Sequence, residues 1–422
     1  MKIFTLIVFI AVYVIMIGFP KFRVYAAAGA AVLYLIAGVV PIAELPGILN
    51  FNVLFMITGM MLTVFFFIES QMPMKIADFL LDKSKNLMMV TIFLSLFAGV
   101  ISAFIDNVAT VLMVAPVALA IAKKRNVSPI PMVISIAVSS NLQGAATLVG
   151  DTTSILLGAY AKMTFTDFFF MEGKPGIFWA VELGALATVP IMLFLFRDMK
   201  EPVSAEEKTV VKDYFPLWML LLTIITLIVA SFFRNRPEMT NGIVCMGFGV
   251  VCMIHSRLKR GDSESVYACL KDLDYMTIIL LASLFVVVAG VTEAGIIDDM
   301  AEMLVKVGGG NLFLLYTLIV WASVGISAFV DNIPYVTAML PVIAGVSARM
   351  GISPNLLYFG LLTGSTLGGN ITPIGASANI TGIGILRKNG YEVPAKTFMR
   401  ISVPFTLAAV TVGYVFLWVF WR

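Results

Sequence analysis

Residues 102–108 read Ser-Ala-Phe-Ile-Asp-Asn-Val, and residues 327–333, 225 positions later, read Ser-Ala-Phe-Val-Asp-Asn-Ile. Both copies lie inside apolar stretches. An ionisable Asp within a membrane segment costs at least about 2.5 kcal/mol, so a membrane protein that carries one twice in matching context is expected to use it. Asp106 and Asp331 are therefore the leading candidates for the working site.

The composition is that of a polytopic membrane protein. Of the 422 residues, 60% are hydrophobic and 13% are charged, and the mean hydropathy of +0.99 exceeds that of soluble globular domains. Apolar runs of about 17 to 22 residues, which cross a bilayer as helices, recur from end to end. We predict an integral protein of a bacterial or archaeal cell membrane. The net charge of +3 gives no indication of nucleic-acid binding.

The repetition extends well beyond the Asp-Asn core. Pro116 matches Pro341 and Gly150 matches Gly375 at the same offset, and this register holds without a gap over about 50 residues. The chain is therefore interpreted as two copies of one unit. The predicted units are a first repeat over residues 1–196, a cytoplasmic linker over 197–215 and a second repeat over 216–422.

The predicted fold is an all-α polytopic membrane protein with two inverted repeats, each of about five transmembrane helices plus a re-entrant hairpin and a broken helix. Amphipathic stretches at 72–81 and 296–305 precede the hairpins and are expected to lie on the membrane surface. The predicted hairpins cover residues 87–122 and 311–348, and the predicted broken helices cover residues 129–163 and 354–386.

The distribution of Lys and Arg favours inverted repeats, because these residues collect in cytoplasmic loops. If each hairpin returns to its own side, each repeat has an odd number of crossings, and 20 of the 28 basic residues fall on one face. This count places Lys21 and Arg23 in the first cytoplasmic loop. Straight-through runs would divide the basic residues equally. We predict both termini outside; two full spans per run would give the same parity and remain an alternative.

Polar, glycine-containing loops interrupt the two broken helices. Backbone groups freed there must be met by protein, water or ligand, and inverted repeats with interrupted helices are common in secondary transporters. Oxygens of such a loop, facing those of a hairpin tip, would make a cation site. The candidate ion- and substrate-binding residues are Asp106, Asn107, Thr110, Asn141, Gly144, Thr147, Gly150, Asp151 and Thr152 in the first repeat, and Asp331, Asn332, Gly369, Asn370, Thr372, Gly375, Ser377 and Asn379 in the second.

The carboxylates among these candidates have alternative roles. Asp is a good N-cap, so Asp106 and Asp331 could simply cap the helices that follow them. Asp151 has no acidic counterpart, since Ala376 stands at the matching position. It could carry a coupling proton, or it could cap a helix that begins after Gly150.

No residue pattern suggests an enzyme. A Ser-His-Asp set and an ATP-binding motif are not found, and the single histidine, His255, lies away from the repeated motifs. No cofactor is expected beyond a coupling ion, sodium or a proton. The predicted sodium sites are Asp106, Asn107 and Gly150 in the first repeat, and Asp331, Asn332 and Gly375 in the second.

Residues 104–116 and 328–334, together with the two glycine loops, resemble the ion transporter superfamily. The resemblance is strongest to the branch of arsenite permeases, D-type sodium/proton antiporters, plant silicon efflux transporters and the melanosomal P protein. It covers nearly the whole chain. It implies one site at the Asp106-Asn107 tip with the loop near Gly150, and a second at the Asp331-Asn332 tip with the loop near Gly375. It also implies a homodimer, although no interface is recognisable in the sequence.

The divalent anion/sodium symporters, which include citrate transporter-like proteins, are more distant relatives by this resemblance and carry Ser-Asn-Thr at their tips. A carboxylate in place of the Ser attracts cations or protons, which counts against a citrate-like substrate. We therefore expect a secondary active ion transporter that works by alternating access, coupled to sodium or protons, for a small inorganic ion or anion such as arsenite. Sodium/proton antiport, an ion channel and dicarboxylate symport are the alternatives.

Overall fold

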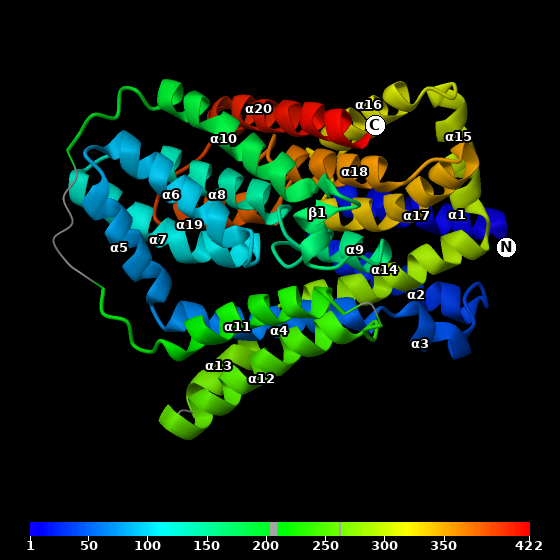
Figure 1. Ribbon diagram of the computed structural model, residues 1–422, viewed down its shortest axis with the longest axis horizontal. Coiled ribbons are helices and arrows are strands. Elements are labelled where there is room, and N and C mark those ends of the chain that lie inside the picture. The colour runs from blue at the N-terminus through cyan, green and yellow to red at the C-terminus, as the bar shows by residue number, and fades with distance from the viewer. Residues whose placement is uncertain (203–208, 234, 261–262) are drawn as a thin grey trace.

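The computed structural model describes residues 1–422 except 203–208, 234 and 261–262. It is almost entirely helical, which confirms the predicted fold class (Figure 1). The helices of the first repeat are α1 (Lys2–Gly18), α2 (Arg23–Ile36), α3 (Leu45–Ile48), α4 (Phe51–Glu69), α5 (Met72–Lys83), α6 (Leu87–Ser102), α7 (Asn107–Arg125), α8 (Ile130–Gly144), α9 (Thr152–Tyr160) and α10 (Ile177–Leu195), with 3-10 helices at Pro20–Phe22, Ile42–Glu44 and Thr166–Phe168.

The second repeat follows the same order. Its helices are α11 (Phe215–Ser231), α12 (Thr240–Arg260), α13 (Ser263–Asp272), α14 (Tyr275–Glu293), α15 (Ile296–Gly308), α16 (Leu312–Ser327), α17 (Asn332–Met350), α18 (Asn355–Gly368), α19 (Ser377–Lys388) and α20 (Ala395–Trp421). Among the described residues, seven helices are long and apolar enough to cross a membrane, and several shorter apolar helices accompany them.

A small antiparallel sheet interrupts the helical fold. Strand β1 (Phe170–Met171) pairs with β2 (Lys174–Pro175). The two residues between them, Glu172 and Gly173, both have positive φ, as a two-residue type I′ turn requires. Trp421 Nε1 at the end of α20 donates to Pro175 O at 2.9 Å, which ties the C-terminus to this sheet.

Each hairpin has two arms that both pack against a third helix. Asn86 and Asn311 cap the first arms through bonds to Met89 N (3.0 Å) and Leu314 N (3.2 Å). Helix α8 packs against both α6 and α7, and α18 packs against both α16 and α17. The chain therefore reverses at residues 103–106 and again at residues 328–331.

The two hairpins enter from opposite ends of the molecule. Helix α5 contacts both arms of the first hairpin, and α15 contacts both arms of the second. These two amphipathic helices lie at opposite ends in Figure 1, as inverted repeats require. The described parts of the linker lie at the α5 end, where Leu87 N donates to Glu201 O at 2.9 Å. Linker residues 203–208 lie outside the described residues.

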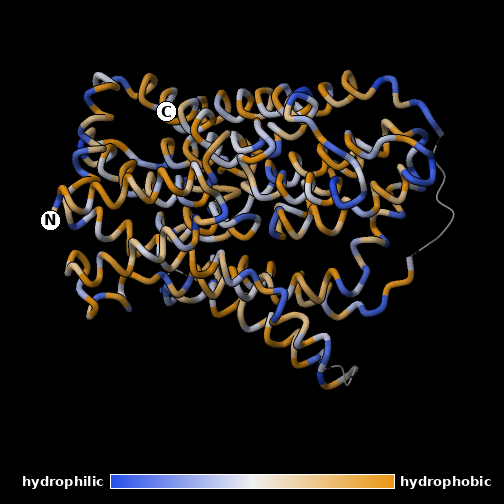
Figure 2. The backbone as a smooth tube through the Cα atoms, turned by 180° about the vertical axis from the view of Figure 1, so that it is seen from behind, coloured by the Kyte–Doolittle hydropathy of each residue, from blue (hydrophilic) through white to orange (hydrophobic). Residues whose placement is uncertain are grey.

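The helices form two groups that each draw on both repeats. In one, which we call the frame, α4 packs against α12 and α2 packs against α14, with α1 and α11 beside them. The other, the hairpin group, contains α6 to α10 and α16 to α20. Figure 2 shows mainly hydrophobic helices in both groups, with hydrophilic residues gathered at the linker end and in connections. The groups touch where α4 meets α9 and where α14 meets α17.

Candidate ion-binding site

The tip of the first hairpin is built around Asp106, the N-cap of α7. Its Oδ1 accepts hydrogen bonds from Val108 N at 2.9 Å and Ala109 N at 3.2 Å. Thr110 Oγ1 donates back to Asp106 O at 3.0 Å, which fixes the first turn. Asp106 therefore caps a helix, but capping uses only one of its two carboxylate oxygens.

Backbone carbonyls converge behind this tip at Gly150. A Cβ added there would lie 2.4 Å from Gly144 O, 2.7 Å from Ala103 O and 2.8 Å from Ser102 O. Only glycine allows the loop between α8 and α9 to approach the end of α6 this closely. Thr147 Oγ1 donates to Ala103 O and holds the loop against the tip.

Asp151 begins α9 and is buried, with 4% of its surface exposed. Its Oδ1 accepts from Ser154 N at 2.7 Å and from Thr153 Oγ1 at 2.8 Å. Its Oδ2 is fully buried and has no hydrogen-bond partner among the described residues. A buried carboxylate oxygen without a partner is costly unless a cation or proton meets it.

Paired asparagines join the two repeats beside the first tip. Asn107 Nδ2 donates to Asn141 Oδ1 at 2.8 Å, and Asn141 Nδ2 donates to Asn370 Oδ1 at 3.1 Å and to Thr366 O at 2.7 Å. Asn370 Nδ2 in turn donates to Val138 O at 2.8 Å. These residues connect α7, α8 and α18, so the tip has a fixed position relative to both broken helices.

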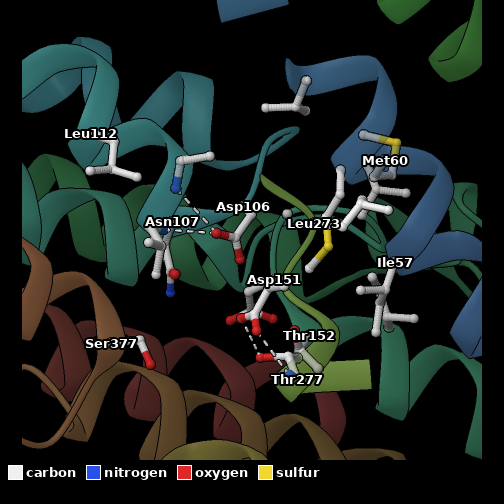
Figure 3. Close-up of a pocket in the computed structure, with 18 of the residues that line it drawn as sticks. Ile57, Met60, Asp106, Asn107, Leu112, Asp151, Thr152, Leu273, Thr277 and Ser377 are labelled. Carbon is white, nitrogen blue, oxygen red and sulfur yellow. Dashed lines mark hydrogen bonds between the residues drawn. The ribbon is translucent and has the colours of Figure 1, made fainter. Parts of the chain in front are cut away.

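The first tip opens into a cavity of about 210 Å³, which we call the acidic cavity. Figure 3 shows Asp106 and Asp151 on one wall, across from the apolar side chains of Ile57 and Met60 on α4. Asp272 and Asp274, which are exposed, also line the cavity. Asp274 caps α14 through Thr277 N at 3.0 Å, with Thr277 Oγ1 at 2.6 Å.

The charged residues described in the lining of the acidic cavity are all negative. Among the described residues that line the acidic cavity, four are aspartates and none is Lys, Arg or His. The uncharged polar residues come from both repeats: Asn107, Thr152, Thr153, Thr277, Asn332 and Ser377. Acidic walls of low dielectric concentrate cations and repel anions. No group of three or more His, Cys, Asp or Glu arranged for a metal ion is found within the described part of the chain.

The second tip has a different electrostatic environment. Asp331 Oδ1 accepts from Ile333 N at 3.0 Å, and Oδ2 forms an ion pair with Arg23 Nη1. Tyr13 Oη donates to Pro334 O at 2.7 Å, so α1 and the start of α2 both hold this tip. The prediction that Arg23 lies in a cytoplasmic loop is therefore wrong. The short turn after α1 brings its side chain to the second hairpin instead.

The backbone of the second tip nevertheless repeats that of the first. A Cβ added at Gly375 would lie 2.5 Å from Gly369 O and 2.8 Å from both Ala328 O and Ser327 O. Thr372 Oγ1 donates to Ala328 O, as Thr147 does to Ala103 O. Asn379 Nδ2 donates to Gly369 O at 3.1 Å and to Thr372 O at 3.0 Å.

The candidate residues therefore divide into two sets. Those that line the acidic cavity are Asp106, Asn107, Gly150, Asp151, Thr152, Asn332 and Ser377. Those that lie outside its lining are Thr110, Asn141, Gly144, Thr147, Asp331, Gly369, Asn370, Thr372, Gly375 and Asn379. Four residues of the two tips and the cavity were not predicted from the sequence: Thr153, Asp272, Asp274 and Arg23. An Asp directly before an apolar run is an N-cap signal that could have drawn attention to Asp274, whereas no local signal marks Arg23.

A model of one transporter family covers most of the chain. The citrate transporter family model matches residues 11–364. The chain belongs to the citrate transporter family.

Relatives of this citrate transporter family member support the same assignment. An uncharacterized transporter of Mycobacterium tuberculosis is 28% identical over 385 residues, covering 88% of this chain and 86% of the relative. The human P protein is 24% identical over 447 residues, covering 87% of this chain and 53% of the P protein. The P protein match confirms the resemblance to the ion transporter superfamily. The protein is a secondary membrane transporter and not an enzyme.

The fold of this family member matches a solved structure. The YdaH transporter of Alcanivorax borkumensis aligns with a TM-score of 0.62 at 15% identity, over 92% of this chain and 88% of that one. At this identity the likeness concerns the fold.

Proposed function

We propose that this protein is a secondary active transporter that works by alternating access and binds its coupling ion, sodium or a proton, at the first hairpin tip between Asp106 and Asp151. The observation that carries the proposal is the acidic cavity, which both residues line, together with the buried Asp151 Oδ2, which has no partner in the described part of the chain. The capping role of each Asp remains compatible with ion binding, because each uses only Oδ1 to cap.

A second cavity supports alternating access. It has a volume of about 370 Å³, and its lining includes the other ends of four helices that line the acidic cavity, α4, α9, α14 and α17. On α9, Ile155 lines the acidic cavity and the next residue, Leu156, lines the second. On α17, Ile333 and Thr337 divide in the same way, one turn apart. On these two helices the lining residues of the two cavities lie one helical turn apart or less, so a movement of the hairpin group would change which cavity reaches the site.

Sodium/proton exchange is the activity that this cavity favours most. Both transported species are cations, and both can neutralise the same pair of carboxylates in turn. A single site that holds either sodium or a proton, but not both at once, would couple the two fluxes in opposite directions. On the orientation predicted from the basic residues, the acidic cavity would open toward the cytoplasm.

A neutral inorganic acid is the second candidate substrate. The hydroxyls and amides of Thr152, Thr153, Asn332 and Ser377 offer hydrogen bonds without a positive charge. Arsenite in its neutral form fits such a lining, with the coupling cation held by the carboxylates. Citrate, after which the family is named, would enter this cavity only with its charge neutralised by cations.

Proteoliposomes test these alternatives directly. We expect an imposed sodium gradient to drive proton movement, and Asp106→Asn to abolish it, while Asp198→Asn, an exposed linker residue, has no effect. The screen also includes arsenite, and citrate with and without a divalent cation. Fluxes that never accumulate an ion against its own gradient would indicate a channel and refute the proposal.

A further inference from the structure

The two hairpin tips share one backbone but differ in charge. Carbonyl oxygens converge at Gly150 and at Gly375 in the same pattern, and a threonine fixes each loop to its tip. Each tip also presents an Asp at the start of a helix. The first Asp faces the acidic cavity, whereas Asp331 is paired with Arg23.

The local sequence of the second tip leaves its carboxylate dependent on a cation. At the first tip two backbone amides, of Val108 and Ala109, stabilise Asp106. At the second, Pro334 stands where Ala109 stands in the first repeat and has no N–H to donate. Asp331 therefore accepts one backbone hydrogen bond, from Ile333, and its other oxygen meets the guanidinium.

Arg23 belongs to the frame, and its position is fixed. Its side chain is 25% exposed and that of Asp331 is 16% exposed, so the pair is largely shielded from water. Tyr13, on the preceding helix, binds Pro334 O and holds the α1–α2 turn against the tip. No Lys, Arg or His among the described residues forms an ion pair with Asp106, and Arg236, in the matching α11–α12 connection, bonds to Met163 O and Asn241 instead.

We propose that Arg23 is a tethered counter-ion that occupies the second cation site, so that only the first tip takes up a mobile ion. The guanidinium neutralises the charge of Asp331. No vacant carboxylate therefore lies beside the carbonyl oxygens that converge at Gly375. The transport cycle then moves one coupling cation at the hairpin tips instead of two. This inference rests on the proposed function, because it assumes that the first tip binds a cation.

Removing the tethered charge should restore the second site. We expect Arg23→Gln to leave Asp331 without a counter-ion, and a shielded carboxylate in that state recruits a cation. Binding of radioactive sodium to purified protein in nanodiscs at pH 8.5, where free carboxylates are ionised, should then increase by about one ion per protomer. Arg23→Lys keeps the positive charge and should bind as many ions as the wild type.

The double variant Arg23→Gln/Asp331→Asn identifies the new site, because it removes the carboxylate that was freed and should return the count to the wild-type value. Sodium should raise the melting temperature of Arg23→Gln further than that of the double variant, which also shows that both are folded. An unchanged sodium count in folded Arg23→Gln overturns the inference, as does a gain that persists in the double variant. Failure of the proposed function has a different signature: Asp106→Asn would bind as much sodium as the wild type and would also keep the wild-type flux.

Discussion

Replacing Asp106 by Asn or by Ala separates its capping role from ion binding. In the structure Oδ1 accepts from Val108 N and Ala109 N, and an Asn side chain at this position can keep both bonds. Asn and Asp are equally good N-caps, whereas Ala costs about 1 kcal/mol. Without sodium, Asp106→Asn should therefore melt with the wild type, and Asp106→Ala should melt lower by about 2 °C.

When sodium is present, the melting response of Asp106→Asn should resemble that of Asp106→Ala and no longer that of the wild type. Exchanging a charged ligand for a neutral amide removes about 1.5–3 kcal/mol, which corresponds to a roughly 10- to 150-fold loss of sodium affinity. Sodium at 100 times the wild-type dissociation constant stabilises the wild type by about 2.7 kcal/mol. At the same concentration both variants should lose about 1.3–2.4 kcal/mol of that stabilisation, although only Asp106→Ala has lost its cap.

The assay is thermal unfolding of detergent-purified protein across a sodium series, with choline as the matching salt, alongside sodium-driven proton flux in proteoliposomes. A proton-only coupling ion would show as loss of flux in Asp106→Asn with no sodium dependence in the wild type. If Asp106→Asn keeps both the sodium-dependent stabilisation and the flux, Asp106 is a cap alone and the ion-binding argument fails.

Three further substitutions test other parts of the site. Gly150→Ala places a Cβ against three carbonyl oxygens, which we expect to cost about 1–3 kcal/mol or more and to abolish flux. Gly325→Ala, on a helix with nothing within 4 Å, is the control and should leave both intact; equal behaviour would contradict the close packing. Asn141→Leu leaves the buried Asn107 amide without its hydrogen-bond partner, which should lower the free energy of unfolding by about 1–3 kcal/mol for each polar group left unpaired. An unchanged melting temperature would show that the asparagine bridge is dispensable. Asp151→Asn keeps the bond to Ser154 N, so flux should fall with little change in melting; unchanged flux would remove Asp151 from the site.

Features of the fold that are local or periodic could be predicted from the sequence. Asp106 and Asp331 were identified as possible caps because capping depends on the next two or three residues, and both do cap helices. The interruptions at Gly150 and Gly375 were also visible, since glycine in an apolar helix leaves a local signature. The inverted arrangement followed from a count of basic residues, which reports the parity of crossings without any knowledge of packing.

The charge environment of the site could not be predicted in the same way. Arg23 and Asp331 are 308 residues apart, and a positive charge after a short first helix has the same sequence appearance as an ordinary interfacial residue. The positive-inside rule counts every Arg near a helix end as a loop residue. It therefore misplaced Arg23 while still giving the right parity, because one residue in 20 does not change the balance.

The structure separates two constraints that the sequence repeat presents as one. Both tips need the same backbone, because two inverted hairpins can only meet a common central region if each loop approaches its tip through glycine. Their charges are under no such requirement, since a cycle driven by one ion needs one vacant carboxylate. A second vacant carboxylate would have to be neutralised in every state of the cycle. In this structure an arginine on the frame does this, so the Asp-Asn motif is repeated in sequence while the vacant carboxylate is not.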